Sequence, residues 1–119
     1  MAFRFETLEI WKDALVYTRK IYLLTKQFPR EELFSIVDQL RRAANSIAAN
    51  IAEGSGSTSK KDFCHYLDIA IKSAYETVSH LYLAKELEYI SEETRKEFYI
   101  NAEVLVKKIQ AFKVYLNKS

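Results

Sequence analysis

The sequence contains few residues that cross-link chains, break helices or form tight turns. Its 119 residues include one cysteine, one proline and two glycines. A single cysteine cannot form an internal disulfide, so nothing in the composition indicates an oxidising compartment. A multi-stranded β fold needs turn residues at short intervals, and their scarcity here favours long helices with few breaks.

Long hydrophobic runs are also missing. No stretch of about 18 residues is free of charge, so no segment is expected to span a bilayer. The first nine residues mix acidic, basic and aromatic side chains and do not resemble a signal peptide. Both features favour a cytoplasmic protein without a membrane partner.

The residues that are present suit one compact domain. Hydrophobic residues make up 49% of the chain and charged residues 29%, a composition that excludes disorder. A chain of 119 residues can bury one substantial core but is short for two domains. The formal net charge of +2 is too small to indicate nucleic-acid binding, so any basic surface must be local.

Four segments repeat an apolar residue at alternating spacings of four and three. This heptad pattern is typical of helices that pack side by side at shallow angles. We therefore predict helices at residues 8–28, 30–53, 59–87 and 92–117. The repeated positions are Ile10, Ala14, Tyr17, Ile21, Leu24 and Phe28, then Leu33, Val37, Leu40, Ala44, Ile47 and Ile51, then Phe63, Leu67, Ala70, Ala74, Thr77 or Val78, and Leu81, and finally Phe98, Ala102, Leu105, Ile109, Phe112 and Leu116.

Each break between these segments coincides with residues that stop or start helices. Pro29 follows the first segment, and Gly54 and Gly56 follow the second. Ser59 begins a Ser-x-x-Asp variant of the capping box, and Ser91 is expected to cap the last helix. Because all three connections are short, neighbouring helices should be antiparallel. The predicted fold class is all-α, an up-down-up-down four-helix bundle that forms one domain over residues 1–119.

Two further apolar stripes are not used by the heptad pattern. An exposed row of large apolar residues usually marks a partner surface, which here would indicate self-association. The alternative is a helix turned further into the core than the heptads suggest. The stripes are Trp11, Leu15 and Tyr22 on the first predicted helix, and Ile71, Tyr75, Val78 and Tyr82 on the third.

The polar residues do not form a recognisable catalytic or metal-binding set. Metal sites in bundles commonly use Glu-x-x-His pairs, and the nearest match, Asp62 with His65, is better explained by a helix cap at Asp62. His80 lies about 22 Å further along the same helix, too far to share a metal with His65. Cys64 is interpreted as a half-buried structural thiol. We predict no catalytic residue, no metal ligand and no cofactor, and a protein that is not an enzyme.

The turn at residues 54–61 superficially resembles a phosphate-binding loop. It lacks the glycine before lysine and follows a helix, so it is not a nucleotide-binding P-loop. Lys60 and Lys61 at a helix start could still contact a phosphate. Pairing of Glu53 with either lysine would instead neutralise both charges, and this structural interpretation is favoured.

The end of the chain has a local excess of positive charge. After Glu103 no acidic residue follows, whereas Lys107, Lys108, Lys113 and Lys118 alternate with Phe112 and Tyr115. Cations combined with aromatic rings are typical of nucleic-acid-binding surfaces. A ring of copies would multiply the patch because joined sites act at high effective concentration. Lys107, Lys108 and Lys113 are therefore the first predicted nucleic-acid contacts.

The second predicted helix contains a recognisable signature, Gln39-Leu40-Arg41-Arg42-Ala43-Ala44, Ser46-Ile47 and Asn50-Ile51-Ala52-Glu53-Gly54. Matching positions precede it, at Leu8, Trp11, Ala14, Ile21, Tyr22, Thr25, Phe28, Pro29 and Glu32, and follow it, at Ser59, Asp62, Phe63, Tyr66, Leu67, Ile69, Ala70, Ser73 and Glu76. Together these residues resemble the four-helix-bundle family encoded by intervening sequences inside bacterial 23S rRNA genes.

That family is similar in fold to the accessory variability determinant of diversity-generating retroelements, a pentameric barrel that binds nucleic acid and its reverse transcriptase. The resemblance thus implies a homopentamer with RNA or DNA, or a protein such as a reverse transcriptase, as partner. The family has no established activity, and its "ribosomal protein" label implies no place in the ribosome. Ser57 and Lys72 depart from the pattern, where Arg and Gly are usual, and remove an expected cation and a close helix contact.

The signature also has a physical interpretation. Small residues from Ala43 to Ala52 let another helix approach closely, and Asn50 among them needs a hydrogen-bond partner. Arg41 is a candidate partner for Glu53 or Asn50 of a neighbouring copy, and the alternative is a solvated Arg41. The predicted interface residues are Trp11, Tyr22, Arg41, Asn50, Glu53, Tyr75 and Tyr82.

The sequence is compatible with two functions. The first is an oligomeric, non-enzymatic bundle that binds nucleic acid through a composite basic surface. The second is a protein-interaction scaffold whose target contacts the aromatic stripe of the third predicted helix.

Overall fold

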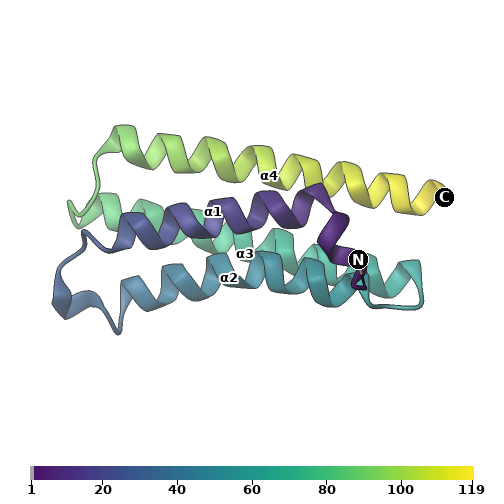
Figure 1. Ribbon diagram of the computed structural model, residues 1–119. Helices are drawn as coiled ribbons and strands as arrows, with labels where there is room; N and C mark the ends of the chain where they lie inside the picture. Colours follow the sequence, from purple (N-terminus) through teal and green to yellow (C-terminus); the bar gives the residue numbers. More distant parts are fainter. Residues whose placement is uncertain (1) are drawn as a thin grey trace.

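The computed structural model describes residues 2–119 and consists of four long helices. They are α1 (Glu9–Thr25), α2 (Ile36–Ser55), α3 (Lys60–Glu86) and α4 (Glu92–Lys118). Short 3-10 helices precede α1 (Arg4–Thr7) and α2 (Arg30–Glu32). Successive helices run in opposite directions, and the α2–α3 turn lies at the same end of the bundle as the C-terminus (Figure 1). The predicted all-α four-helix bundle is confirmed.

The core is built from the predicted heptad positions. Each helix contributes one apolar stripe, and together the stripes form a single cluster between the four helices. Thr77, rather than Val78, is the buried residue where the pattern left a choice. Its hydroxyl donates to the Ser73 carbonyl oxygen at 2.9 Å, so a polar group is buried without loss of a hydrogen bond.

The helix starts follow the predicted capping chemistry at two places. The hydroxyl oxygen of Ser59 accepts a hydrogen bond from the Asp62 amide at 3.1 Å, and that of Ser91 accepts one from the Thr94 amide at 3.1 Å. The α3–α4 turn contains Glu88 at φ 63°, the left-handed conformation that often ends a helix.

The start of α2 differs from the prediction. The helix begins at Ile36 rather than at residue 30, because residues 30–32 form a separate 3-10 turn closed by Leu33 N donating to Arg30 O at 3.1 Å. Leu33, predicted as a core position, is 46% exposed. The buried Ile36 occupies the core at this end of the bundle instead.

The helices form a closed square in which each packs on two neighbours. Contacts join α1 to α2, α2 to α3, α3 to α4 and α4 to α1, with α2 and α3 packed most extensively and α1 and α4 least. The α1–α2 side of the bundle therefore lies opposite the α3–α4 side. No helix within residues 2–119 has an apolar stretch long enough to cross a membrane.

Candidate interaction surfaces

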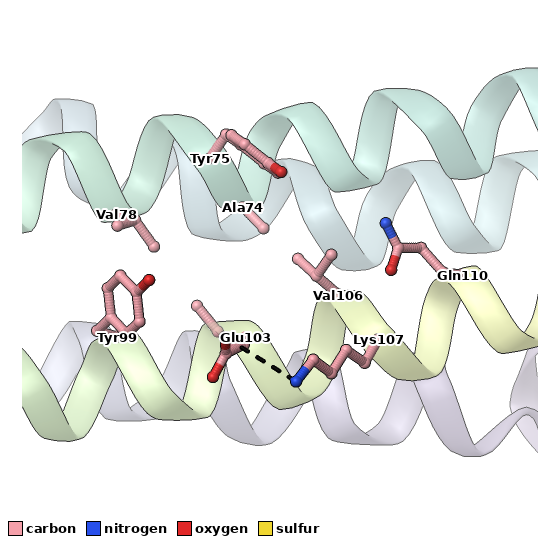
Figure 2. Close-up of a pocket in the computed structure, with 9 residues that line it drawn as sticks. Ala74, Tyr75, Val78, Tyr99, Glu103, Val106, Lys107 and Gln110 are labelled. Atoms are coloured by element: carbon pink, nitrogen blue, oxygen red, sulfur yellow. Dashed lines mark ion pairs between the residues drawn. The ribbon is translucent and has the colours of Figure 1, made fainter.

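An open groove of about 300 Å³ runs between α3 and α4. Figure 2 shows Val78 of α3 opposite Tyr99 of α4, and Tyr75 and Val106 also line the groove. Tyr75 is 67% exposed and Tyr82, further along α3, is 48% exposed. The second apolar stripe of α3 is therefore divided. Ile71 and Val78 are half-buried against the core, whereas the two tyrosines remain accessible on this side of the bundle.

Arg95 holds the aromatic rings at one end of this side. Its guanidinium lies 4.3 Å from the centre of the Tyr82 ring and 5.7 Å from that of Tyr99. Nε and Nη2 donate to the two carboxylate oxygens of Glu92 at 2.7 and 3.0 Å, which lowers the pKa of Glu92. Arg95 is only 7% exposed. A cation stacked on two rings and bound to a carboxylate fixes Tyr82 and Tyr99 in place.

The rim of the groove carries the ion pair between Glu103 and Lys107, whose nearest charged atoms are 4.0 Å apart (Figure 2). Both residues are exposed and both belong to α4. An exposed pair one helical turn apart is weak, so either side chain can exchange its partner for another at little cost.

Arg41 joins α2 to α1 within the chain. Its Nε donates to the hydroxyl of Thr25 at 2.9 Å, and its guanidinium lies 4.6 Å from the centre of the Tyr22 ring. Asn45 Nδ2 donates to the Tyr22 hydroxyl at 2.6 Å. The position of Arg41 is therefore explained by contacts within its own chain, and not by the two alternatives predicted from the sequence, a neighbouring copy or solvent.

Other predicted interface residues also have partners inside the bundle. Asn50 Nδ2 donates to the carbonyl oxygen and the hydroxyl of Ser46, at 2.8 and 2.9 Å. Trp11 is half-buried, with its ring 4.7 Å from that of Phe5 in an edge-on arrangement. Glu53 is exposed. Among the seven predicted interface residues, Tyr75 and Tyr82 are thus the large apolar ones left most accessible.

The lysines of α4 do not form one patch. Lys108 Nζ donates to Glu9 and Asp13 of α1, at 3.0 Å each, and these hydrogen bonds raise the pKa of Lys108. Lys113 forms an ion pair with Asp68 of α3. Lys107 lines the α3–α4 groove, whereas Lys108 lines the cleft between α1 and α4. The positive charge predicted for this segment is therefore split between two sides and partly offset by carboxylates.

Lys60 and Lys61 lie exposed in the first turn of α3. Within residues 2–119 neither forms an ion pair with Glu53, so the predicted neutralisation is not observed. The adjacent Asp62 accepts a hydrogen bond from the Ser57 hydroxyl at 2.7 Å. Both lysines are thus available to a ligand.

The described part of the chain contains no cluster of three His, Cys, Asp or Glu side chains that could hold a metal ion. His80 lies 3.2 Å from the carboxylate of Glu76, one helical turn away on the same helix. Cys64 is half-buried, with its Sγ 3.6 Å from the side-chain oxygen of Asn117. These polar groups are explained by local pairing.

Three cations of α1 and its C-cap are not among the contacts predicted from the sequence. Lys12, Arg19 and Lys26 are all exposed, and no ion pair joins any of them to another residue in the described range. Their spacing of seven residues places them on one side of the helix, a signal that was present in the sequence.

The fold and these surfaces define a small four-helix bundle with an open aromatic groove and exposed cations. The family model described as 23S rRNA-intervening sequence protein matches residues 6–111, and the chain belongs to that family. Among solved structures, the chain is similar to a protein with unknown function from the S23 ribosomal protein family of Bacteroides thetaiotaomicron. The two chains share 27% identity with a TM-score of 0.77, over 87% of this chain and 97% of the other. No curated protein matches the sequence.

Proposed function

We propose that this protein is a non-enzymatic bundle that assembles into a homo-oligomer, a pentamer, and binds nucleic acid in the cytoplasm. The observation that carries the proposal is the exposed aromatic groove between α3 and α4. Large apolar residues gathered on one side of a small domain usually mark a partner surface. Here the Tyr99 ring in the groove and the neighbouring Tyr82 ring are also held in place by Arg95, so ordering these two side chains on binding costs little.

A second copy of the chain suits this groove. The exposed Glu103 and Lys107 on its rim carry opposite charges, so each can pair with an opposite charge on a neighbouring subunit. The groove itself offers the apolar surface of Tyr75, Val78 and Val106. An apolar centre with a charged rim is the usual anatomy of a protein interface.

Light scattering on the purified protein tests the assembly. We expect the mass of five chains for the native protein and a smaller species for Tyr75→Glu, which puts a charge into the groove. Val114→Glu is the matched control. Val114, on α4, is exposed like Tyr75, but it does not line the groove. A native monomer, or equal loss of assembly in both variants, contradicts the proposal.

Nucleic-acid binding is supported by the exposed cations and by the family. Lys60 and Lys61 lie at one end of the bundle, and Lys107 lies on the groove rim, where assembly would bring copies of it closer together. Lys108 and Lys113 contribute less in this proposal, since carboxylates of α1 and α3 already offset their charge.

Fluorescence anisotropy with labelled RNA and DNA tests this second part. We expect binding at low salt and a steep linear fall of log affinity with log salt concentration, because released counterions drive binding to phosphates. If neither nucleic acid binds at low salt, the nucleic-acid function is wrong.

The alternative is a scaffold that binds another protein, such as a reverse transcriptase, through the same groove. An apolar channel between two helices fits the apolar face of a third helix, which favours this candidate. A complex with the purified partner that resists nuclease and is lost in Tyr75→Glu, together with a monomeric native protein, would select it over self-assembly.

A further inference from the structure

The outer side of α1 alternates cations with apolar side chains. Lys12, Leu15, Arg19, Tyr22 and Lys26 follow one another at spacings of three and four, which places them in one stripe along the helix. The three cations are exposed, Leu15 is 44% exposed and Tyr22 is half-buried. Such alternation differs from an ordinary solvated helix face, in which acids and bases are mixed.

The carboxylates of α1 lie away from this stripe. Glu9 and Asp13 both accept hydrogen bonds from Lys108 of α4, so they belong to the α1–α4 side. On the α2 side, Asp38 is paired with Arg42 at 4.0 Å. No carboxylate in the described range is therefore paired with the cations of the stripe, whereas two carboxylates are paired with Lys108.

The stripe also contains a rigid stacked pair. The Tyr22 ring and the Arg41 guanidinium are 4.6 Å apart, Arg41 is tied to α1 through Thr25, and the Tyr22 hydroxyl accepts a hydrogen bond from Asn45. Aromatic rings and guanidinium planes are the groups on which proteins stack unpaired bases. A pair held by hydrogen bonds is ready to do so without further ordering.

We infer that the α1–α2 side of the bundle binds single-stranded nucleic acid. In this arrangement Lys12, Arg19 and Lys26 contact phosphates along one strand and the Tyr22–Arg41 pair stacks against a base. The inference rests on the proposed nucleic-acid function and locates it. Adjacent cations are seven residues apart, or about 10.5 Å along the helix, so the row follows a backbone over about 21 Å. A duplex offers phosphates but no free base faces.

The side inferred to bind nucleic acid differs from the groove proposed for assembly. The α1–α2 side lies opposite the α3–α4 groove, so a neighbour that occupies the groove does not cover the cation row of the same subunit. A ring requires a second contact face on each subunit, and in this arrangement one of the two remaining sides supplies it. Each subunit of a ring then presents one row, and the rows bind one strand jointly.

The decisive variant replaces Lys12, Arg19 and Lys26 by Gln, with binding measured by anisotropy on a 20-nucleotide single strand, as RNA and as DNA. Near 0.1 M salt we expect at least a tenfold loss of affinity for whichever strand the native protein binds. The slope of log affinity against log salt should fall by about 2, since each lost phosphate contact on a single strand contributes about 0.7.

The matched control replaces Arg30, Lys72 and Lys96 by Gln, which also removes one arginine and two lysines. All three are exposed and without ion pairs to other residues in 2–119, but they lie on the α1–α2 connection, α3 and α4. We expect less than a threefold loss, from the change in net charge alone. Equal losses in the two triple variants overturn the inference and leave the proposed function standing.

A third variant compares the inferred side with the end of α4. Replacing Lys107, Lys108 and Lys113 by Gln should cost less affinity than the α1 variant, and the reverse order overturns the inference.

A duplex of the same sequence should bind several-fold more weakly than the single strand, and equal binding removes the base-stacking role of Tyr22. A native protein that binds no strand at low salt overturns both the proposed function and the inference. Circular dichroism verifies that each variant keeps its helix content.

Discussion

The bundle has two helix–helix interfaces on opposite sides, the α2–α3 seam and the α1–α4 seam, and they are built differently. Along the α2–α3 seam the helices lie close together at the buried Gly54, and the hydroxyl of Ser73 donates to that of Ser46 at 2.8 Å. Along the α1–α4 seam the helices pack least and leave a cleft of about 240 Å³. That cleft is crossed by ion pairs, including Lys20 with Glu97 at 3.3 Å.

The difference shows that one core can combine two kinds of cohesion. The α2–α3 seam depends on close apolar packing, which is strong and sensitive to shape. The α1–α4 seam depends on exposed ion pairs and on Tyr17, whose hydroxyl donates to the Phe98 carbonyl oxygen at 3.3 Å. Asn101 Nδ2 is buried beside the same cleft without a protein partner in the described range. The α1–α4 seam should therefore open more readily than the rest of the bundle.

The largest expected difference between the seams concerns two buried leucines. Leu67→Ala leaves a cavity in the closely packed part of α3 and should destabilise the protein by about 4 kcal/mol. Leu105→Ala should cost only about 2 kcal/mol, because Leu105 borders the α1–α4 cleft and its neighbours can relax into that space. Urea unfolding of both variants measures the difference. Equal losses would show that the two seams are packed alike.

A single added methyl group tests the close approach itself. A Cβ at Gly54 would lie 2.6 Å from Tyr66 Cβ and 2.9 Å from Phe63 Cδ1, so Gly54→Ala should cost about 1–3 kcal/mol through overpacking. Gly56→Ala is the control, since its nearest atom would be Glu53 O at 3.5 Å. Gly56 has φ −83°, which alanine adopts freely, so this change should be neutral or slightly stabilising. Thermal unfolding of the pair decides, and a neutral Gly54→Ala would contradict the packing described.

The fold could be predicted because its signals are local. Heptad spacing and caps act within one or two helical turns, and they gave four helices whose ends differ by a few residues from those observed. The exception is the start of α2. Pro29 and the two glutamates that follow it suit a helix start, but in the structure these residues begin a 3-10 turn and not α2. The buried residue at this end of the bundle is therefore Ile36 and not the predicted Leu33. Which of two plausible starts is used depends on contacts with the core.

The surfaces were less predictable because pairing between helices depends on their rotation. The segment after Glu103 has no acid of its own, yet Lys108 meets carboxylates up to 99 positions away and Lys113 meets one 45 positions away. Arg41 likewise finds Tyr22 on another helix. By contrast, the cations of α1 recur every seven residues, and that spacing alone could have revealed them.

Alkaline pH should weaken the α1–α4 seam in particular. Burial raises the pKa of Tyr17 above its ordinary value of 10.0, so the unfolded chain loses this proton first. The contribution of protonated Tyr17 to the free energy of unfolding is therefore complete below about pH 10 and is lost as the pH rises further. Hydrogen bonds to Asp13 and Glu9 raise the pKa of Lys108 above 10.5, which acts in the same direction.

Melting temperatures between pH 8 and pH 11 measure this effect. Tyr17→Phe should cost about 1 kcal/mol at neutral pH by removing one buried hydrogen bond, and its stability should fall less steeply with pH than that of the native protein. Tyr115→Phe removes a phenol that is exposed and should keep the native pH dependence. If Tyr17→Phe falls as steeply as the native protein, burial of Tyr17 is not the cause.

The smallest expected effect separates the two kinds of cohesion by their response to salt. Removing the ion pair between the half-buried Lys20 and the exposed Glu97 with Lys20→Gln should cost less than about 1 kcal/mol. This cost should disappear in 1 M salt, where charges are screened beyond about 3 Å. Ser73→Ala removes a partly buried hydrogen bond of the α2–α3 seam and should cost about 1 kcal/mol at any salt concentration. Urea unfolding at low and high salt gives both values. A Lys20→Gln cost that persists in high salt would mean that the α1–α4 seam relies on packing of the lysine stem over the Phe98 ring, which lies 5.4 Å from Lys20 Nζ, rather than on charge.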